Sequence, residues 1–435
     1  MRPILSGYQS KTNNVFVLSR RIAQTREVVP SGIDRRGIGV LSAGHACVDM
    51  CQGAVPALLP FLVAQRGYSF GAASALVLAA TVASSIVQPL FGLASDRHSM
   101  PWLMPAGLLL AGVGLAAAGL VHPYGLTFAA ITLSGLGVAA YHPEASRYAN
   151  YVSGRRHATG MSLFSVGGNA GFALGPLLVT PLLLLAGPPG TVGLLLPLAL
   201  AALLFTRELA RLHGFRPAGA RGSGDPAAHN QWGPFARLGL AVSVRSVVYF
   251  GLLTFVPLYY VSTLHTSKAE GNLALTVMLV AGAIGTLIGG RLADRIGTRP
   301  IFVGSLAALT PLIALFLAVG PGPGMVVLAA IGGLTIATFS VTVVMGQRFL
   351  PGRVGVASGV TLGLSIGVGG LAASALGAVA DQWGLHTALD IVMLAPLPAL
   401  ALALTLPRVG ADRTRRRRAR MGTPALITRT APEEP

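Results

Sequence analysis

Twelve stretches of about 20 mostly apolar residues, separated by short segments with charges, Pro or Gly, restrict this chain more than any other feature. A helix needs about 20 such residues to cross about 30 Å of hydrocarbon. The sequence therefore predicts an all-α integral membrane protein with twelve transmembrane helices. The predicted spans are 38–63, 71–94, 101–121, 126–151, 159–186 and 189–206, followed by 237–262, 271–292, 300–319, 325–348, 355–379 and 385–406.

The composition agrees with burial in lipid. Hydrophobic residues make up 53% of the chain and charged residues 11%, against roughly 25% charged residues in a soluble domain. The net charge of +18 would suggest a nucleic-acid partner if the protein were soluble. The basic residues flank the apolar spans, however, so we expect the lipid bilayer as partner and no nucleic acid. Cys47 and Cys51 match no metal or disulfide pattern and are interpreted as structural thiols.

The longest internal polar stretch, 207–236, divides the twelve spans into two sets of six. Such a boundary predicts two bundles, over 37–206 and 237–407, joined by a cytoplasmic central loop. Residues 1–36 are polar and basic and lack the apolar core of a secretory signal, so we interpret them as a cytoplasmic N-terminal tail. Residues 408–435 form a basic C-terminal tail.

The distribution of basic residues predicts the orientation. If the N-terminus lies in the cytoplasm, 29 of the 32 Lys and Arg residues fall in cytoplasmic segments or near the cytoplasmic ends of the spans. Of the other three, Arg66 and Lys268 fall in outside loops and Arg245 lies within a span. Cytoplasmic loops carry an excess of Lys and Arg in membrane proteins. We therefore expect a multi-pass protein of a bacterial inner membrane, with both termini in the cytoplasm.

An internal repeat supports the two bundles. The segment GLASDR at 92–97, after the second span, recurs as GRLADR at 290–295, after the eighth. Gly168 and Gly171 in the fifth span correspond to Gly367 and Gly370 in the eleventh. Two parallel, pseudo-symmetric six-helix bundles are a transporter architecture, and in it the substrate site lies near the membrane midplane.

These duplicated loops resemble the signature of the major facilitator superfamily, over about residues 37–407. Three segments resemble the fosmidomycin-resistance branch of that superfamily more closely: GHACVDMCQGAVPALLPFL, YHPEASRYANYVSGRRHATGMSLFSVGGNAGFALGP and RSVVYFGLLTFVPLYYV. The resemblance implies a secondary transporter, with fosmidomycin-like phosphonates or other small anionic antibiotics and metabolites as substrates.

Asp49 and His45 in the first span are the first candidates for proton coupling. Asp49 lies about twelve residues into its helix, roughly 18 Å from the end, which places it near the middle of the membrane. His45 lies one turn away on the same face. An ionisable group within a span costs about 2.5–3.5 kcal/mol, so each is a functional candidate. The alternative is a buried polar pair that only fixes helix packing.

The fourth span contains His142, Glu144 and Arg147 beside Pro143, which removes a backbone hydrogen bond. Glu144 is a further candidate for proton coupling. Alternatively, Glu144 and Arg147 pair across one helical turn as a structural clamp. His142 is a candidate for substrate binding.

Arg245 is the one charged residue in the interior of the seventh span, about nine residues from its cytoplasmic start, and its guanidinium requires an anion. The anion is either a carboxylate of the other half, Asp49 or Glu144, or an acidic group of the substrate held in a bidentate manner. The remaining alternative is that Arg245 extends to the cytoplasmic interface. Gln88 and Gln347 are weaker candidates for substrate contact.

The duplicated loops predict a conformational latch that includes Asp96, Arg97, Asp294, Arg295 and Arg299. We expect Asp96 to approach the start of the eleventh helix and Asp294 the start of the fifth. A carboxylate near the positive end of a helix contributes about 0.3–1 kcal/mol, enough to favour one conformer if the contact exists only there.

Gly171, Gly175 and Pro176 in the fifth span resemble the G-x-x-x-G-P motif of superfamily antiporters. Two glycines four residues apart permit close helix packing and Pro176 predicts a kink, so packing explains the motif as well as transport direction does.

No sequence motif for ATP binding, haem, zinc or a serine nucleophile is present, so we expect no cofactor, no metal and no enzyme activity. The favoured function is export of a small anion in exchange for protons by a monomer. The alternatives are proton-coupled uptake of an organic anion, a transporter-like receptor, and a membrane-embedded enzyme.

Overall fold

The computed structural model describes residues 32–407, except for residues 98, 155, 216–228, 352, 354, 355 and 358. The predicted tails therefore lie largely or wholly outside the described residues, as does much of the predicted central loop.

Long helices account for most of the described chain. In the N-terminal half they are α2 (Arg35–Arg66), α3 (Phe70–Arg97), α4 (Leu103–Leu120), α5 (Tyr124–Val152), α6 (His157–Ala186), the 3-10 helix η1 (Pro188–Leu194) and α7 (Leu195–Leu212). In the C-terminal half they are α8 (Trp232–Ser262), α9 (Lys268–Ile296), α10 (Thr298–Ala318), α11 (Pro321–Phe349), the π-helix η2 (Gly359–Leu364), α13 (Ser365–Leu394) and α14 (Pro396–Leu404).

Ten helical segments of the described residues are long and apolar enough to cross a membrane. One of them, 359–404, is interrupted by Gly384, whose φ of 86° breaks the helix between the predicted eleventh and twelfth spans. In addition, α3 contains the shorter apolar stretch Phe70–Ser85. The chain is therefore an all-α, multi-pass membrane protein whose helices are compatible with twelve crossings.

Several helices extend beyond the predicted spans because polar groups stabilise their ends. Asp34 caps α2 by accepting a hydrogen bond from the backbone N–H of Gly37, at 2.7 Å. Ser267 and Glu270 form a reciprocal capping box at the start of α9. Such caps satisfy backbone donors that the first turn of a helix leaves free, so hydropathy alone underestimates helix length.

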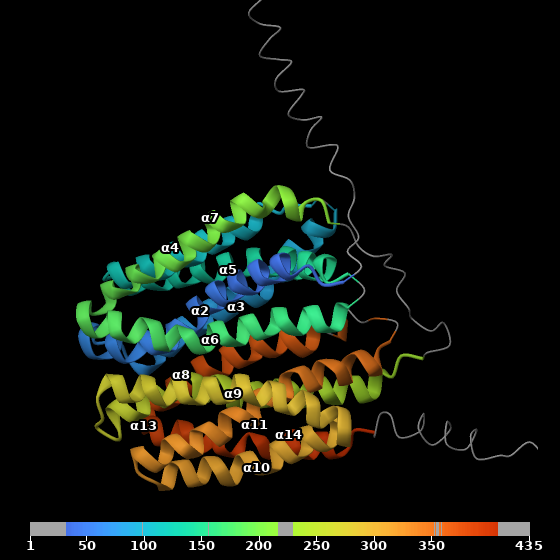
Figure 1. The fold of residues 1–435 in the computed structure, drawn as a ribbon. Coiled ribbons are helices and arrows are strands. Elements are labelled where there is room, and N and C mark those ends of the chain that lie inside the picture. The colour runs from blue at the N-terminus through green and yellow to red at the C-terminus, as the bar shows by residue number, and fades with distance from the viewer. Residues whose placement is uncertain are drawn as a thin grey trace, which may run out of the picture.

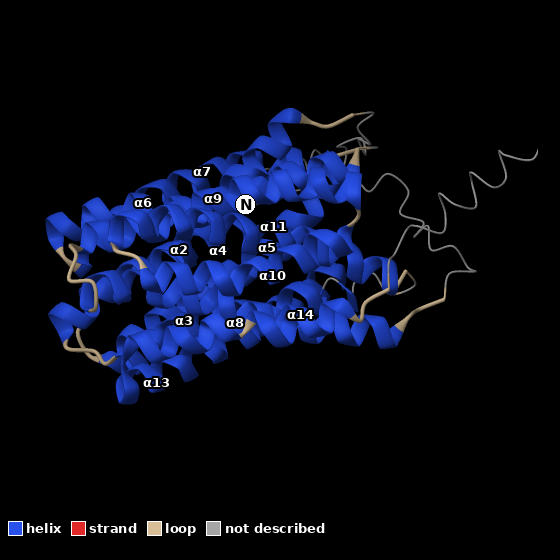
Figure 2. Cartoon of the chain, turned by 90° about the horizontal axis from the view of Figure 1, so that it is seen from below, coloured by secondary structure: helices blue, strands red, loops and turns tan. Residues whose placement is uncertain are grey.

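The helices lie side by side, and their loops gather at two opposite ends (Figures 1 and 2). In Figure 1 the helices of the N-terminal half, in blue and green, lie above those of the C-terminal half, in yellow and red. The first and last described residues lie at the same end of the molecule, at the right of that view. We call this the terminal end.

One backbone hydrogen bond recurs in both halves. The N–H of Asp34 donates to the carbonyl of Val152 at 2.8 Å, and the N–H of Gln231 donates to the carbonyl of Phe349 at 2.7 Å. Both the donors and the acceptors are 197 residues apart in the sequence. Each bond ties the start of the first helix of a half to the end of the fourth. The internal repeat in the sequence therefore corresponds to a repeat in structure.

Helices α2 and α6 pack with their backbones in close contact. A Cβ atom on Gly171 would collide with the carbonyl of Ala46, and one on Gly175 would collide with the backbone at Gly53. Pro176 lacks an N–H, so the carbonyl of Phe172 has no helical partner four residues on, and it lies against Gly53. The predicted packing role of this motif agrees with these contacts.

Hydrogen bonds join the two halves near the end opposite the termini. The Asp381 carboxylate accepts from the backbone N–H groups of Phe70 and Gly71 at the start of α3, at 2.7 and 2.9 Å. The Asn272 amide of α9 donates to the carbonyl of Ala57 at 3.0 Å and to the hydroxyl of Thr180 at 2.9 Å. Helices α3 and α13 therefore meet at this end, as do α6 and α9.

Candidate functional site

A buried cluster of three side chains lies between α2 and α5 in the N-terminal half. We call His45, Asp49 and His142 the triad. His45 and Asp49 of α2 are each 8% exposed, and His142 of α5 is half-buried. The Nε2 atom of His45 lies 3.3 Å from Oδ2 of Asp49, and Nε2 of His142 lies 3.3 Å from Oδ1 of the same carboxylate. The two Nε2 atoms lie 3.1 Å apart.

Backbone carbonyls fix both imidazole rings of the triad. Nδ1 of His45 lies 2.8 Å from the carbonyl oxygen of Phe164 in α6, and its ring stacks on the Phe164 ring at 4.1 Å. Nδ1 of His142 lies 2.8 Å from the carbonyl oxygen of Val138, one turn earlier in α5. Each ring therefore presents Nε2 to the carboxylate.

The triad is also the one group of three among the described residues whose metal-ligand atoms all lie within 4.8 Å of one another. Two imidazoles and a carboxylate are a donor set that binds divalent transition metals. Sequence reasoning placed Asp49 and His45 together but assigned His142 to the substrate, because neither spacing nor period brings α5 against α2.

Glu144 lies apart from the triad, in the clamp that was one of its two predicted alternatives. The carboxylate is fully buried and accepts from Nη2 of Arg147 at 2.7 and 2.8 Å. It also accepts from the backbone N–H of Met100 at 2.7 Å. Arg147 donates in addition to the hydroxyl of Ser99 at 2.8 Å. The pair thus ties α5 to the segment before α4.

Arg245 is fully buried in α8 and pairs with no carboxylate among the described residues. Its Nη1 donates to the hydroxyl of Thr338 at 2.9 Å and to the carbonyl of Thr335 at 3.4 Å, both in α11. The guanidinium carbon lies 3.8 Å from the centre of the Phe339 ring. Neither predicted interdomain partner, Asp49 or Glu144, binds Arg245 here, and its side chain is buried against α11.

The Nε and Nη2 atoms of Arg245 form no hydrogen bond with the described part of the protein. These two donors share one edge of the planar guanidinium, and that edge can hold a carboxylate or phosphonate with two parallel hydrogen bonds. The other side of the group is anchored to α11. The arrangement therefore presents a pre-oriented, unpaired anion-binding edge inside the C-terminal half.

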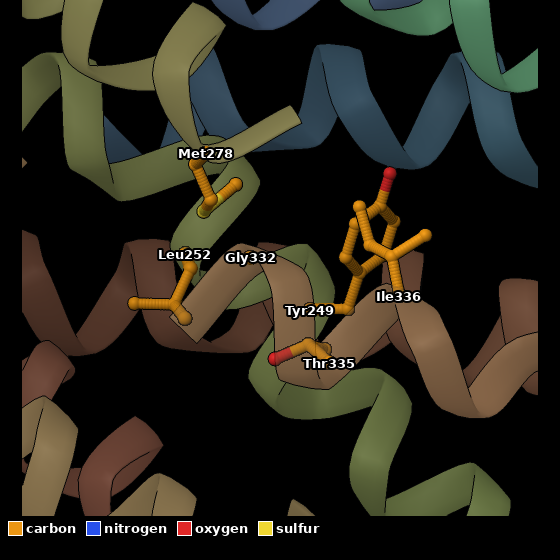
Figure 3. A pocket seen from close by; sticks show the side chains of 6 residues that line it. All are labelled: Tyr249, Leu252, Met278, Gly332, Thr335 and Ile336. Atoms are coloured by element: carbon orange, nitrogen blue, oxygen red, sulfur yellow. The ribbon is translucent and has the colours of Figure 1, made fainter. Parts of the chain in front are cut away.

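Tyr249 lies near both buried sites and was missed by sequence reasoning. It follows Arg245 by one turn of α8, is 8% exposed, and lies close enough to feel the charges of both Asp49 and Arg245. It lines a narrow pocket with Leu252, Met278, Gly332, Thr335 and Ile336, and its hydroxyl points toward a helix of the N-terminal half, in blue (Figure 3). A phenol in an apolar span, four residues from an arginine, was the signal available in the sequence.

The predicted latch residues lie at the terminal end. Asp294 and Arg295 are exposed in the last turn of α9. Arg299 begins α10 and donates to the carbonyl of Leu404 at 2.7 Å. The side chains of Asp96, Arg97 and Ala158 lie outside the described residues, so both predicted contacts stay predictions. Two further candidates, Gln88 and Gln347, are half-buried in α3 and α11.

A second group missed by sequence reasoning joins the start of α2 to the end of α7 through ion pairs, at the terminal end of the N-terminal half. Arg211 of α7 donates to Asp34 at 2.6 Å and to Glu208 at 2.8 Å, and Glu208 also pairs with Arg36. Burial alone would raise the pKa of Asp34, but Arg211 and the N–H of Gly37 hold it below its usual value.

Of the thiols, Cys47 is half-buried, Cys51 is buried, and both are free.

Comparisons with known proteins agree with this geometry. The family model of the Major Facilitator Superfamily matches residues 41–267 and 238–431. The fosmidomycin resistance protein of Escherichia coli (strain K12) is 32% identical over 380 residues, which cover 85% of this chain and 92% of that protein. YfnC of Bacillus subtilis (strain 168), described as an uncharacterized MFS-type transporter, is 32% identical over 382 residues, with the same coverage.

Solved structures show the same fold at low sequence identity. A point mutant of the nucleoside transporter NupG superposes with a TM-score of 0.66 at 14% identity, over 85% of this chain and 98% of NupG. A bacterial homolog to the human lysosomal transporter Spinster, in an inward-facing and occupied conformation, has a TM-score of 0.67 at 15% identity, over 85% and 96%. The predicted superfamily, with its resemblance to fosmidomycin-resistance proteins, is therefore confirmed, and the chain belongs to the Major Facilitator Superfamily of membrane transporters.

Proposed function

We propose that the protein exports small organic anions, including fosmidomycin-like antibiotics, across a bacterial inner membrane in exchange for protons. The observation that carries the proposal is the free Nε and Nη2 edge of Arg245. An unpaired guanidinium buried among apolar side chains is costly. A site that repeatedly binds and releases an anion keeps such an edge free between substrates.

The relatives support the substrate class. A protein named for fosmidomycin resistance is 32% identical to this chain over nearly its whole length. A phosphonate offers the oxygen geometry that a side-on guanidinium binds with two hydrogen bonds. Thr335 and Tyr249, which line the narrow pocket, lie beside Arg245 and supply its immediate surroundings.

Proton exchange is proposed from the triad. Asp49 has no Lys or Arg partner among the described residues, and the two imidazoles are the groups at hydrogen-bond distance from its carboxylate. A mid-membrane carboxylate that can be neutralised by a proton is the usual device of proton-driven transport. Glu144, bound by Arg147 and Met100, is assigned to the clamp in this proposal.

The direction of transport is proposed from the resistance in the relative's name. The contacts between the halves at the end opposite the termini fit, with cytoplasmic termini, a conformer closed to the outside, which transporters of either direction adopt. Proton-coupled uptake is the alternative, because it uses the same residue types.

Transport into inverted membrane vesicles tests the function. An imposed proton gradient, acid inside, should drive accumulation of labelled fosmidomycin, and collapse of the gradient by an uncoupler should release it. Vesicles with Arg245→Gln should accumulate no more than empty vesicles. Arg237→Gln serves as the control, because Arg237 lies on the same helix but is only half-buried and, within the described part of the chain, donates to the carbonyl oxygens of Gly233 and Thr405. Accumulation only with the opposite gradient would favour uptake.

A further inference from the structure

We propose that the triad holds one proton in common, so that His142 is the third member of the proton site and not a substrate ligand. The inference rests on the proposed proton-coupled exchange and names the groups that carry the proton. It follows from the hydrogen-bond geometry of the two imidazole rings.

The tautomer of each ring follows from its backbone partner. A carbonyl oxygen can only accept a hydrogen bond, so a ring nitrogen 2.8 Å from it must carry a hydrogen. Nδ1 of His45 is therefore protonated by its contact with Phe164, and Nδ1 of His142 by its contact with Val138. Each neutral ring then has only a lone pair at Nε2.

These two lone pairs face each other and the carboxylate. The Nε2 atoms are 3.1 Å apart, and each lies 3.3 Å from an oxygen of Asp49. Three acceptors at hydrogen-bond distance, with no donor among them, repel one another. One additional proton turns a repulsive contact into a charge-assisted hydrogen bond. Two additional protons would set two N–H donors against each other across 3.1 Å.

The described surroundings of the triad offer no other compensating charge. Among the described residues, the other titratable groups near Asp49 are Cys47 and Cys51 on α2, Tyr141 on α5 and Tyr249 on α8, and none of them is cationic. On α6, the ring and the carbonyl of Phe164 contact His45, and Gly168, which has no side chain, lies next to His45 and Asp49. With Asp49 ionised and one imidazole protonated, the triad is neutral as a whole, which suits its depth in the bilayer.

Gly168 keeps the space for this arrangement. A Cβ atom at that position would lie 2.5 Å from Nε2 of His45 and 2.7 Å from Oδ2 of Asp49. Gly168→Ala would therefore displace these groups without removing a donor or an acceptor. This variant separates the geometry of the triad from its chemical composition.

Nitrogen-15 NMR of histidine-labelled, purified protein tests the proposal without substrate or gradient. Near neutral pH we expect both triad rings to be protonated at Nδ1 and one proton to be shared at Nε2. His142→Gln should abolish the shared-proton signal and leave the Nδ1–H of His45 in place. Gly168→Ala should weaken or abolish it while all three groups remain.

The matched control is an exposed pair with the same spacing. His386 and Asp390 on α13 lie 3.1 Å apart, four residues from each other like His45 and Asp49, but are 57% and 43% exposed in their side chains. His386→Gln should leave the triad signals unchanged. When fosmidomycin is added, we also expect the wild type and His386→Gln each to release about one proton. His142→Gln should release far less.

Two results would overturn the proposal. One is a nitrogen-15 spectrum of folded wild-type protein at neutral pH in which neither Nε2 atom of the triad carries a proton. The other is a stoichiometric metal ion, removed by a chelator and absent from His142→Gln, because the shared cation would then be the metal. If the NMR result holds but transport proves independent of protons, only the proposed function fails. If transport is proton-coupled and no shared proton is found, only this inference fails.

Discussion

The two halves share a backbone scheme but place different chemistry on it. The hydrogen bond from Asp34 to Val152 recurs 197 residues later from Gln231 to Phe349. At the same offset, Phe339 of α11 takes the place of His142 of α5. The N-terminal half carries a titratable triad between its first and fourth helices. The C-terminal half carries, between the corresponding helices, an arginine over an aromatic ring.

The difference suggests how an exchanger can place proton binding in one half and anion binding in the other. A proton site needs groups that can change charge, as imidazole does near physiological pH and as a carboxylate can do when burial raises its pKa. An anion site needs a charge that does not change, which arginine provides. If each half binds one ligand, the effect of one bound ligand on the other must cross the interface between the halves. Tyr249 interacts electrostatically with both Asp49 and Arg245 and is the residue through which we expect this effect to pass.

The largest effect should come from removing the titratable carboxylate. Asp49→Asn keeps the shape of the side chain but cannot ionise, so we expect proton-coupled transport to be lost in a protein that still folds and inserts. Substrate-induced proton release by purified protein is the measurement. Asp390→Asn, on the exposed His–Asp pair, is the control and should release protons normally. Undiminished proton release from folded Asp49→Asn would show that Asp49 does not carry the exchanged proton.

The next effect concerns the fixed charge of the C-terminal half. Arg245→Lys retains a positive charge but loses the side-on edge, so we expect substrate affinity to fall at least tenfold, about 1.4 kcal/mol. Equilibrium binding of labelled fosmidomycin measures this loss. Proton release per bound substrate should be little changed, because the triad is intact. A fall in affinity no larger than that of Arg237→Gln would contradict an anion-binding role.

Much of the fold was predictable because hydropathy and basic residues act locally along the chain. The spans, the repeat and the pairing of His45 with Asp49 all followed from spacing within one helix or from self-similarity. The clamp between Glu144 and Arg147 was one of two alternatives that the spacing offered, but the partners of His142 and Arg245, and the bond from Met100 to Glu144, did not follow. Each depends on which face of α5, α8 or α11 turns toward a neighbour, and that is set by close contacts such as Gly171 against Ala46. The bond between Glu144 and Met100 also links residues 44 apart.

A smaller effect should reveal the communication between the halves. Tyr249→Phe removes only the hydroxyl, which interacts electrostatically with both Asp49 and Arg245, so we expect a change of a few-fold in the coupling and little change in folding. A double-mutant cycle with Asp49→Asn and Tyr249→Phe measures it through substrate affinity. Changes in binding free energy that simply add would mean that the halves do not communicate through this residue.

The latch prediction addresses how the halves move. Asp294→Ala should slow turnover more than it weakens binding, because a contact present in only one conformer alters populations. Exchange rate and substrate affinity, measured on the same preparation, separate the two effects. Asp390→Ala, an exposed carboxylate at the opposite end of the molecule, is the control. A collapse of affinity with an intact exchange rate would rule out the latch.

The smallest effect should distinguish the terminal ends of the two halves. Asp34 caps α2 and binds Arg211, whereas Gln231, at the equivalent position, makes no side-chain cap to α8. Asp34→Ala should therefore lower stability by about 1–2 kcal/mol, the range of a helix cap, and Gln231→Ala should have little effect. Thermal unfolding in detergent gives both values.

The dependence of this difference on pH identifies its electrostatic part. The pKa of Asp34 is lower in the folded protein than its usual value near 3.9, because the charge and hydrogen bonds of Arg211 and the Gly37 N–H outweigh the cost of burial. A depressed pKa stabilises the folded state above the unfolded value, and that stabilisation is lost as the pH falls through the folded value. The gap between wild type and Asp34→Ala should thus be constant from pH 8 to about pH 5 and shrink below about pH 4. Since Gln231 cannot ionise, Gln231→Ala should show no such trend. A gap that stays the same at low pH would assign the effect of Asp34 to its neutral hydrogen bonds, and the terminal ends of the two halves would then differ in capping and not in charge.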